Sequence, residues 1–440
     1  MNARAAHGRR RRSPAEDHLR LLGKQIPPPK PEIVRAQAHE RAHRDVPRFL
    51  LTLVLAVVVA LVAVQWFRPI PRPVFRSSLS GGLRLAGALP SLPWPAAGSA
   101  ALSAEGAGSF GHAGPTTAVP IASLAKVLTA YVVLKDHPLT PGSSGPSIAV
   151  PADVVAAYKA GVAAQQSELA VTPGETLNEL QALEGLLVAG ANDMATLLGE
   201  WDAGSTSAFV EKMDASARLL GLSSTHITDP SGLDPATVST PADLIRLGEA
   251  AMALPAFAQM VAMAQVTLPV AGTIYNLDAD LGTDGFVGIK TGNDTAAGGC
   301  FLFDAQQAVD GQSLTLVGVV LGQDTTTPTA AALGAADALV RAAFADASPM
   351  PLVSPGQVVG RVTTAWGSSV PVTASPASIV AWSGLQIAVH VKVESLPSSL
   401  PRGARIGVFD VVLGGQHLSL LLTTPSGLSG PSVVWRLTRL

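Results

Sequence analysis

The sequence contains few of the features that indicate metal or cofactor chemistry. One cysteine, Cys300, occurs in 440 residues, so no disulfide can form within the chain. It lies in an apolar run at 299–303, where we expect a buried core thiol rather than a reactive one. The nine histidines show no metal-ligand spacing, and no glycine-rich phosphate loop occurs. We therefore predict no metal and no cofactor.

Charge is scarce and unevenly placed. Charged residues make up 14% of the chain, against 48% hydrophobic residues. The first 48 residues hold twelve Lys/Arg and five Asp/Glu, with three prolines at 27–29, and we predict a disordered basic tail over 1–48. The basic block at 9–12 could bind a polyanion. The apolar run that follows favours a membrane instead, so we expect no nucleic-acid partner.

That apolar run, residues 49–67, holds 19 residues without a charge. As a helix rising about 1.5 Å per residue it would span roughly 28 Å, close to the hydrocarbon core of a bilayer. We predict an uncleaved, single-pass transmembrane anchor in the cell membrane. Positive charge on its N-terminal side places the N-terminus in the cytoplasm and the rest outside. A cleaved signal peptide is the alternative, and the long basic region argues against it.

Composition divides the remainder into three parts. Residues 68–97 are rich in proline and predict a semi-extended linker. Residues 98–348 place helical patterns between strands at both ends, which is an α+β arrangement. Residues 349–440 alternate apolar and polar positions between Pro/Gly/Ser turns, and predict a small β-domain whose last strand lies at 432–437. A spacer, a partner-binding module and a stabilising appendage are all open readings of that domain.

Periodicity places the elements of the 98–348 domain. We expect strands at 100–102, 108–110, 266–268, 286–290, 300–303 and 314–321. We expect helices at 121–136, 152–160, 177–201, 207–220, 241–253 and 328–344, with a turn near 192 inside the third.

A serine and a lysine begin the first of these helices. Ser123 and Lys126 are separated by three positions, so they share one face of a helix. A serine hydroxyl needs a base, and a lysine amine serves when desolvation lowers its pKa. Roughly 0.6 such pairs are expected by chance in a chain of this composition, so a buried helix with one exposed lysine is the alternative reading.

Two further motifs bear on that pair. Asn192 lies at a turn between two apolar helical patterns, where a plain Asx turn would also explain it. Lys290, Thr291 and Gly292 follow one another on a predicted strand. A cation and a hydroxyl there could hold a substrate carboxylate, and the glycine would let a ligand approach the backbone closely. The alternative is an exposed strand end that turns at glycine.

Taken together, the order Ser-x-x-Lys, Asn, Lys-Thr-Gly resembles the penicillin-recognising serine enzymes. The surrounding sequence resembles the D-alanyl-D-alanine carboxypeptidases of peptidase family S11, and looks closest to actinobacterial members. The segments that carry this resemblance are 120–126, 173–177, 229–234, 239–243 and 288–292. The resemblance implies a DD-peptidase/β-lactamase-like catalytic domain over 98–348, in which helices flank an antiparallel sheet and form a separate all-helical subdomain.

The resemblance also implies roles for the matching residues. Ser123 would be the nucleophile, attacking a peptidoglycan stem peptide that ends in D-Ala-D-Ala, and Lys126 would be its base. Asn192 would hydrogen-bond the substrate amide and help to orient Lys126. The terminal carboxylate would lie on Lys290 and Thr291, next to Gly292. The oxyanion would lie between the backbone N–H groups of Ser123 and Asn293, and β-lactams would acylate Ser123 as inhibitors.

One position departs from the family pattern. The middle motif is Ser-x-Asn in the family, and Gly190 stands here in place of the serine. General acid–base participation is worth about 10²–10⁴-fold, so its loss could weaken turnover while penicillin still acylates the enzyme. A catalytically weakened penicillin- or peptidoglycan-binding homologue is therefore the alternative function. A serine β-lactamase is a third reading, against which the lack of a Glu-x-x-Leu-Asn motif after Asn192 argues.

Overall fold

The computed structural model describes residues 31–79, 82–105, 108–323, 326–413 and 416–439. The chain divides into two compact units, residues 1–70 with 431–440 and residues 71–430. Most of the predicted basic tail, residues 1–30, lies outside the described residues.

The described residues of the first unit form two helices. Helix α1 (Pro31–Phe67) starts inside the segment that we predicted to be disordered up to residue 48. That prediction is wrong for 31–48, because the prolines at 27–29 precede the helix and do not interrupt it. The part from 47 to 67 has a mean hydropathy of 2.6 and buries none of its length in the protein. It is the helix among the described residues that is long and apolar enough to cross a bilayer.

The second helix of this unit, α10 (Val433–Thr438), replaces the strand predicted at 432–437. Ser432 begins it, since the serine hydroxyl accepts a hydrogen bond from the backbone N–H of Trp435. The side chain of Arg439 then donates to the carbonyls of Gln65 and Pro69, each at 3.1 Å, at the end of α1. A short apolar run does not distinguish strand from helix by periodicity, and here the serine cap and these contacts favour the helix.

The second unit is organised around a five-stranded antiparallel sheet in the order β11-β12-β13-β3-β4. Its strands are β11 (Phe286–Asp294), β12 (Gly298–Val309), β13 (Gln312–Gln323), β3 (Ser99–Ala104) and β4 (Gly108–Ala113). Helix α9 (Pro328–Ala345) covers the face that carries Phe301 and Phe303, while α7 (Pro241–Met252) covers the face that carries Leu302 and Val317. Successive residues of a strand point to opposite faces, so both faces are apolar and β12 is continuously hydrophobic from residue 300 to residue 303.

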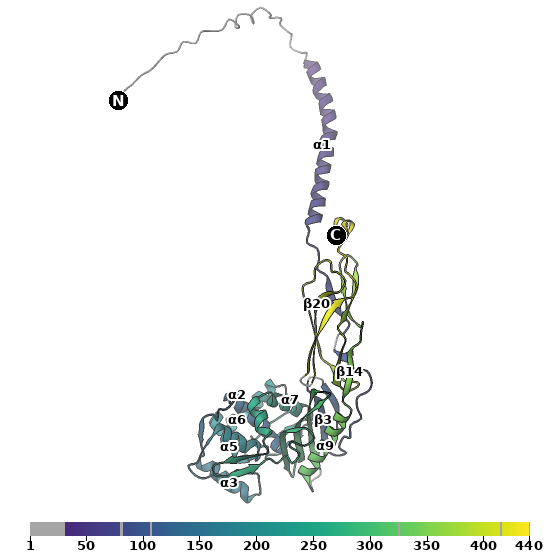
Figure 1. The fold of residues 1–440 in the computed structure, drawn as a ribbon. Coiled ribbons are helices and arrows are strands. Elements are labelled where there is room, and N and C mark those ends of the chain that lie inside the picture. Colours follow the sequence, from purple (N-terminus) through teal and green to yellow (C-terminus); the bar gives the residue numbers. More distant parts are fainter. Residues whose placement is uncertain (1–30, 80–81, 106–107, 324–325, 414–415, 440) are drawn as a thin grey trace, which may run out of the picture. The chain divides into compact units, whose positions relative to one another are not determined.

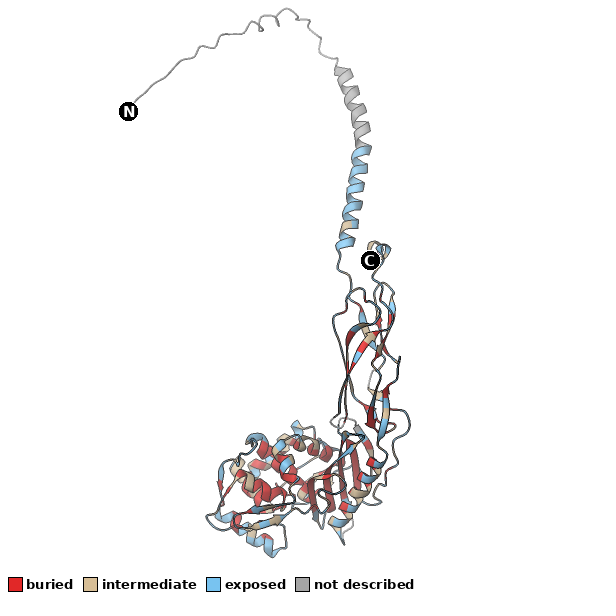
Figure 2. Ribbon diagram, viewed as in Figure 1, coloured by how far each residue is buried: buried red, intermediate tan, exposed pale blue. Residues whose placement is uncertain are grey.

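A helical layer forms around the α7 side of the sheet (Figure 1). Its helices are α2 (Ala125–Asp136), α3 (Ala152–Ala163), α4 (Glu179–Leu187), α5 (Asn192–Ala203), α6 (Thr206–Leu219) and α8 (Pro255–Val261). Figure 2 shows that the inner sides of these helices and the sheet are buried. The helix predicted over 177–201 is two helices that meet at Gly190, which has a φ of 71°. The predicted α+β fold class is confirmed.

Two-stranded pairs connect these layers. They are β5 (Val119–Pro120) with β8 (Val238–Ser239), β6 (Ser147–Ala149) with β7 (Thr176–Asn178), and β9 (Gln265–Leu268) with β10 (Gly272–Tyr275). In the first pair, β5 directly precedes the segment that carries Ser123, and its partner β8 comes later in the chain, directly before α7.

The C-terminal region of this unit is a second β structure. Six strands pair in the order β1-β15-β16-β21-β20-β19: β1 (Val74–Ser77), β15 (Val358–Thr363), β16 (Ser369–Ala374), β21 (Gln416–Thr424), β20 (Ala404–Leu413) and β19 (Val389–Val393). Strand β14 (Ser348–Val353) pairs with β17 (Ala377–Ala381), and β18 (Gln386–Ile387) pairs with β2 (Leu83–Arg84). Because β1 and β2 lie within 68–97, the predicted linker contributes strands to this region, and a pure spacer is the wrong description of it.

The C-terminal strands share a hydrophobic core with the α9 side of the catalytic sheet. Trp382 is fully buried and its ring meets the edge of Phe110 at 4.8 Å between centroids. Its indole N–H donates to the carbonyl of Ala343 at the end of α9. Residues 349–430 therefore pack on the catalytic fold through apolar contacts.

Candidate active site

Ser123 lies in a single 3₁₀ turn, Ala122–Leu124, that leads directly into α2. The sequence placed it at the start of a helix, and the structure moves it one turn ahead of the α-helical part. Ala122 has a φ of 46°, a left-handed conformation that non-glycine residues rarely adopt. Such backbone strain is typical of functional sites, where the surrounding structure holds it in place.

Lys126 is the most enclosed polar residue of the site. Its side chain is fully buried, and its Nζ lies 2.8 Å from Ser123 Oγ, 2.7 Å from Asn192 Oδ1 and 2.9 Å from the carbonyl oxygen of Ser231. Three acceptors match the three donors of an ammonium group. When the amine is neutral, its lone pair can instead accept the proton of the serine hydroxyl.

The surroundings of Lys126 favour that neutral form. Burial, followed by the neighbouring charge of Lys290, lowers the pKa of Lys126 from its ordinary value to about 7. The carboxylates of Asp229, Glu168 and Asp193 act in the opposite direction and keep the pKa from falling further. A base poised near neutral pH can take a proton and return it within one reaction cycle.

The third acceptor of Lys126 was not found in the sequence. The carbonyl of Ser231 belongs to a loop that Asp229 holds, because its carboxylate accepts the backbone N–H groups of Ser231 and Leu233, each at 3.1 Å. Thr129 of α2 also donates to the carbonyl of Pro230 at 2.7 Å. A main-chain acceptor leaves no trace in residue type, so only the similarity of segment 229–234 to the family hinted at it.

Asn192 is the first residue of α5, and its neighbours fix it. Its backbone N–H donates to the carbonyl of Ser167 at 2.8 Å, and its side-chain oxygen accepts from Lys126. The next residue, Asp193, points elsewhere, since its carboxyl accepts the N–H of Leu169 at 3.0 Å and burial raises its pKa to about 8. Asn192 is therefore a side-chain ligand of the lysine and not a simple turn residue.

Strand β11 brings the second group of predicted residues to the same place. Lys290 and Thr291 are 3% and 4% exposed, and Lys290 Nζ donates to the carbonyl of Thr291 at 3.0 Å. Gly292 lies against Ser123, because a Cβ there would come within 2.9 Å of the backbone nitrogen of Ser123. The Asn293 side chain donates to Thr329 Oγ1 at 2.8 Å.

Gly190 faces Lys290 across this site. Its φ of 71° is left-handed, and a Cβ there would lie 3.0 Å from Lys290 Nζ. A serine at this position would therefore direct its side chain at the lysine amine. In this chain that space has no hydroxyl.

These residues surround one cavity of about 510 Å³. The predicted residues that line it are Ser123, Asn192, Lys290, Thr291, Gly292 and Asn293. Lys126 lies behind Ser123 and reaches the cavity through its hydrogen bonds. The structure thus brings all seven predicted residues together, from three separate stretches of the chain.

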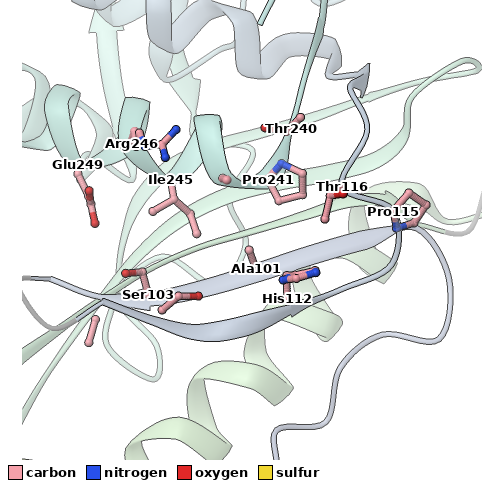
Figure 3. Close-up of a pocket in the computed structure, with 13 residues that line it drawn as sticks. Ala101, Ser103, His112, Pro115, Thr116, Thr240, Pro241, Ile245, Arg246 and Glu249 are labelled. Atoms are coloured by element: carbon pink, nitrogen blue, oxygen red, sulfur yellow. The ribbon is translucent and has the colours of Figure 1, made fainter. Parts of the chain in front are cut away.

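A second cavity, of about 530 Å³, lies away from these residues (Figure 3). It is bounded by α7 on one side and by strand β3 and the edge strand β4 on the other. Figure 3 shows Arg246 and Glu249 of α7 across from His112 and Ser103 of the strands. None of the predicted site residues lines it.

The two clusters have complementary chemical capacities. A serine hydroxyl against a desolvated amine can act as a nucleophile. A buried lysine and a threonine at the other wall can bind an anion. Among the described residues, no group of three or more His, Cys, Asp or Glu could hold a metal ion. Cys300 is buried, and burial raises the pKa of its thiol to about 12, so it is unreactive as expected.

Comparison with known proteins agrees with this geometry. The profile of the D-alanyl-D-alanine carboxypeptidase family, Peptidase S11, matches residues 108–325. The D-alanyl-D-alanine carboxypeptidase DacB2 of Mycobacterium tuberculosis is 37% identical over 185 residues, which are 40% of this chain and 59% of that protein. A D-alanyl-D-alanine carboxypeptidase of Streptomyces sp. K15 is 28% identical over 55% of this chain and 88% of that protein.

Solved structures extend the comparison to the fold. A mutant of the Streptomyces K15 DD-transpeptidase superposes with a TM-score of 0.52 at 25% identity, covering 57% of this chain and 99% of that one. Penicillin-binding protein 5 of Haemophilus influenzae, at 20% identity, shares the fold with a TM-score of 0.54 over 77% of this chain and 99% of its own. Through its catalytic region the chain belongs to the D-alanyl-D-alanine carboxypeptidase family, Peptidase S11.

Proposed function

We propose that the chain is a membrane-anchored serine D,D-carboxypeptidase that removes the terminal D-alanine from peptidoglycan stem peptides. The observation that carries this proposal is the Lys126 amine, fully buried and 2.8 Å from Ser123 Oγ. With a pKa of about 7, this amine can act as the general base that the serine needs. Family membership supplies the substrate class.

In the first half of the reaction, Ser123 Oγ attacks the carbonyl carbon of the penultimate D-alanine, and its proton passes to Lys126 Nζ. A bond forms between Oγ and the carbonyl carbon. The C–N bond then breaks, and the proton held by Lys126 goes to the departing nitrogen, so that D-alanine leaves and an acyl-enzyme remains. The backbone N–H groups of Ser123 and Asn293 stabilise the oxyanion, and removing one such donor typically costs about 3–4 kcal/mol.

The other wall of the cavity binds the substrate end. Lys290 and Thr291 receive the terminal carboxylate, because a buried cation and a hydroxyl favour a charged acceptor. Asn192 holds Lys126 through its oxygen and offers its amide N–H₂ to the substrate peptide. A β-lactam has the same carboxylate and a strained amide in place of the scissile bond, and so it acylates Ser123 as an inhibitor.

The second half of the reaction hydrolyses the acyl-enzyme, and here Gly190 matters. Water must be deprotonated beside the ester, and the side chain that the family supplies at position 190 is absent. This observation favours one alternative function, a homologue that is acylated by penicillin or binds peptidoglycan but turns over slowly. Serine β-lactamase activity is the weaker candidate, and slow turnover of nitrocefin is the expected result.

Location completes the proposal. The apolar part of α1, from 47 to 67, spans the cytoplasmic membrane once, supported by its length, its mean hydropathy of 2.6 and its exposure. The basic residues before it place the N-terminus in the cytoplasm and the active site outside. The stem peptide and β-lactams are then reached from the outer side.

The test uses the full chain in detergent with a pentapeptide that ends in D-Ala-D-Ala. Wild-type protein should release D-alanine, and Ser123→Ala should not. Labelling by a fluorescent penicillin without D-alanine release would select the weakened homologue instead. If the protein is not labelled by the penicillin and also releases no D-alanine at high protein concentration, both functions are contradicted.

A further inference from the structure

We propose that Asp278 is the counter-ion of Lys290 and a positioning residue for recognition of the substrate carboxylate. The inference rests on the proposed function and goes beyond it, since the carboxylate of Asp278 takes no part in the family motifs. In this chain the carboxylate stabilises the positive charge of Lys290, which has no hydroxyl partner at position 190.

Lys290 has fewer partners than its chemistry allows. An ammonium group carries three donors, and among the described residues one hydrogen bond is found, to the carbonyl of Thr291 at 3.0 Å. Its side chain is 3% exposed. A Cβ at Gly190 would lie 3.0 Å from the amine, so the space where a serine could have bonded it carries no side chain. A buried ammonium in this condition tends to lose its proton.

Asp278 has the complementary property. It is 5% exposed, and its Oδ1 accepts the backbone N–H of Asp280 at 3.0 Å, whereas its Oδ2 is buried and has no hydrogen-bond partner. A buried carboxylate oxygen without a partner is costly unless a positive charge compensates it. The neighbouring residue, Leu277, lines the active-site cavity, and its Cδ1 would lie 3.5 Å from a Cβ at Gly190.

The loop that carries Asp278 is fixed in place. The Asn276 side chain donates to the carbonyls of Val261 and Met263 at 3.2 and 3.1 Å, and its oxygen accepts the N–H of Asp278 at 3.0 Å. These contacts tie the loop to the end of α8, which packs on β11. The backbone of Asp278 is therefore fixed in position, next to Leu277, which lines the cavity.

The two groups influence each other's protonation. Burial lowers the pKa of Lys290 to about 8, and the charge of Asp278 opposes that fall. Burial raises the pKa of Asp278 to about 6, and Lys290 opposes that rise, while Asp280 adds to it. No ion pair within 4.0 Å joins them in the described part of the chain, so the influence acts through space without direct contact, in a protein interior that screens charge weakly.

The arrangement orders the charges of the site. At pH 7, between the two pKa values, Asp278 is ionised and Lys290 is protonated. The charge of Lys290 in turn lowers the pKa of Lys126. The lysine that binds the carboxylate thus keeps its proton while the lysine that serves as base gives its proton up. Asp278 lines no part of the cavity, whereas Lys290 does, so the counter-ion acts from behind the wall and leaves the anion site open.

The test compares Asp278→Asn with Asp280→Asn in the full chain. Asparagine keeps the oxygen that accepts the N–H of residue 280, so the turn is retained while the charge is lost. Asp280→Asn is the matched control, since it removes a carboxylate two residues away that does not act on Lys290. The measurement is the second-order rate of acylation by a fluorescent penicillin from pH 6 to pH 10, beside labelling by a neutral sulfonyl fluoride that has no carboxylate.

We expect the basic limb of the penicillin profile to move to lower pH by about one unit in Asp278→Asn, with a loss of about fivefold at pH 8 that approaches about tenfold at pH 9. Sulfonyl fluoride labelling should change less than threefold, and Asp280→Asn should follow wild type in both assays. In a Lys290→Arg background the Asp278→Asn substitution should no longer move the basic limb, because a guanidinium keeps its charge throughout this range.

Coincident pH profiles for wild type and Asp278→Asn would overturn the inference and leave the proposed function intact. An equal loss with penicillin and with the sulfonyl fluoride would also overturn it, as it would show a structural role. If Asp278→Asn does not fold, Asp278→Glu replaces it, and wild-type penicillin kinetics are then expected with the charge retained. If penicillin fails to label the wild-type protein and no D-alanine is released, the proposed function itself has failed.

Discussion

The consequence of glycine at position 190 can be measured with two substitutions that differ by one atom. Gly190→Ala and Gly190→Ser place the same Cβ on a residue whose φ is 71°. A left-handed conformation costs a non-glycine residue about 1–2 kcal/mol. The Cβ would also come within 3.0 Å of Lys290 Nζ, the mobile end of a long side chain, which can shift slightly. Both variants should therefore lose about 1–2 kcal/mol of unfolding free energy.

The catalytic effect should separate the two variants. The serine restores a hydroxyl beside Lys290, and general acid–base participation is worth about 10²–10⁴-fold. After labelling with a penicillin, the acyl-enzyme of Gly190→Ser should decay at least about tenfold faster than that of Gly190→Ala. D-alanine release, measured in parallel, should rank the variants in the same order.

The alanine variant serves as the control for backbone strain. Equal decay rates in the two variants would refute the reasoning, because they would show that a hydroxyl at this position does not assist deacylation. A gain in unfolding free energy in either variant would refute the argument from the left-handed backbone.

Three further outcomes follow from the geometry. The rate of acylation should rise as the pH passes about 7, where Lys126 loses its proton, and fall above about 8, where Lys290 loses its proton. A rate that stays flat across this range would contradict the assignment of Lys126 as the base and of Lys290 as the residue that binds the carboxylate. Gly292→Ala should abolish penicillin labelling and lower the melting temperature, since its Cβ would come within 2.9 Å of the backbone nitrogen of Ser123, which cannot move away as a flexible side chain could. Gly334→Ala, with open space around it, should label normally. Trp382→Ala should lower the unfolding free energy by about 3–5 kcal/mol, because its buried ring fills the core shared by the C-terminal strands and the five-stranded sheet. Val358 is exposed, so Val358→Ala should change the unfolding free energy by less than about 0.5 kcal/mol. Chemical denaturation measures both values.

The sequence predicted those parts of the site that depend on residue type and spacing. Ser123 and Lys126 share a helical face whichever way the first turn is wound, so their contact could be anticipated. Lys290 and Thr291 could be placed on a strand because glycine and apolar residues surround them. Their meeting with Asn192 in one cavity came from the resemblance, since no local pattern brings distant segments together.

The features that escaped prediction depend on main-chain groups and on tertiary contacts. The carbonyl of Ser231 completes the coordination of the lysine amine, yet a carbonyl is present in every residue. In the sequence Asp278 looks like any acidic loop residue. Only the structure shows that its Oδ2 is buried without a hydrogen-bond partner and that its charge acts on Lys290. Strand β1 was hidden in a proline-rich stretch, because its partner β15 lies almost three hundred residues away.

The C-terminal helix illustrates the same limit. Residues 432–437 carry an apolar run that suits a strand as well as a helix. The structure favours the helix through the Ser432 cap and through Arg439, which donates to carbonyls at the end of α1. The contacts of Arg439 could not be assigned without knowing that it lies beside residues 65–69.

The central claim is that Ser123, with Lys126 as its base, forms a covalent acyl-enzyme. The most direct measurement is mass spectrometry of the full chain after a short exposure to a penicillin, followed by proteolysis to locate the adduct. We predict a mass increase equal to one penicillin, on the peptide that contains Ser123, absent from Ser123→Ala and strongly reduced in Lys126→Met. An adduct on a different residue, or D-alanine release that persists in Ser123→Ala, would contradict the account.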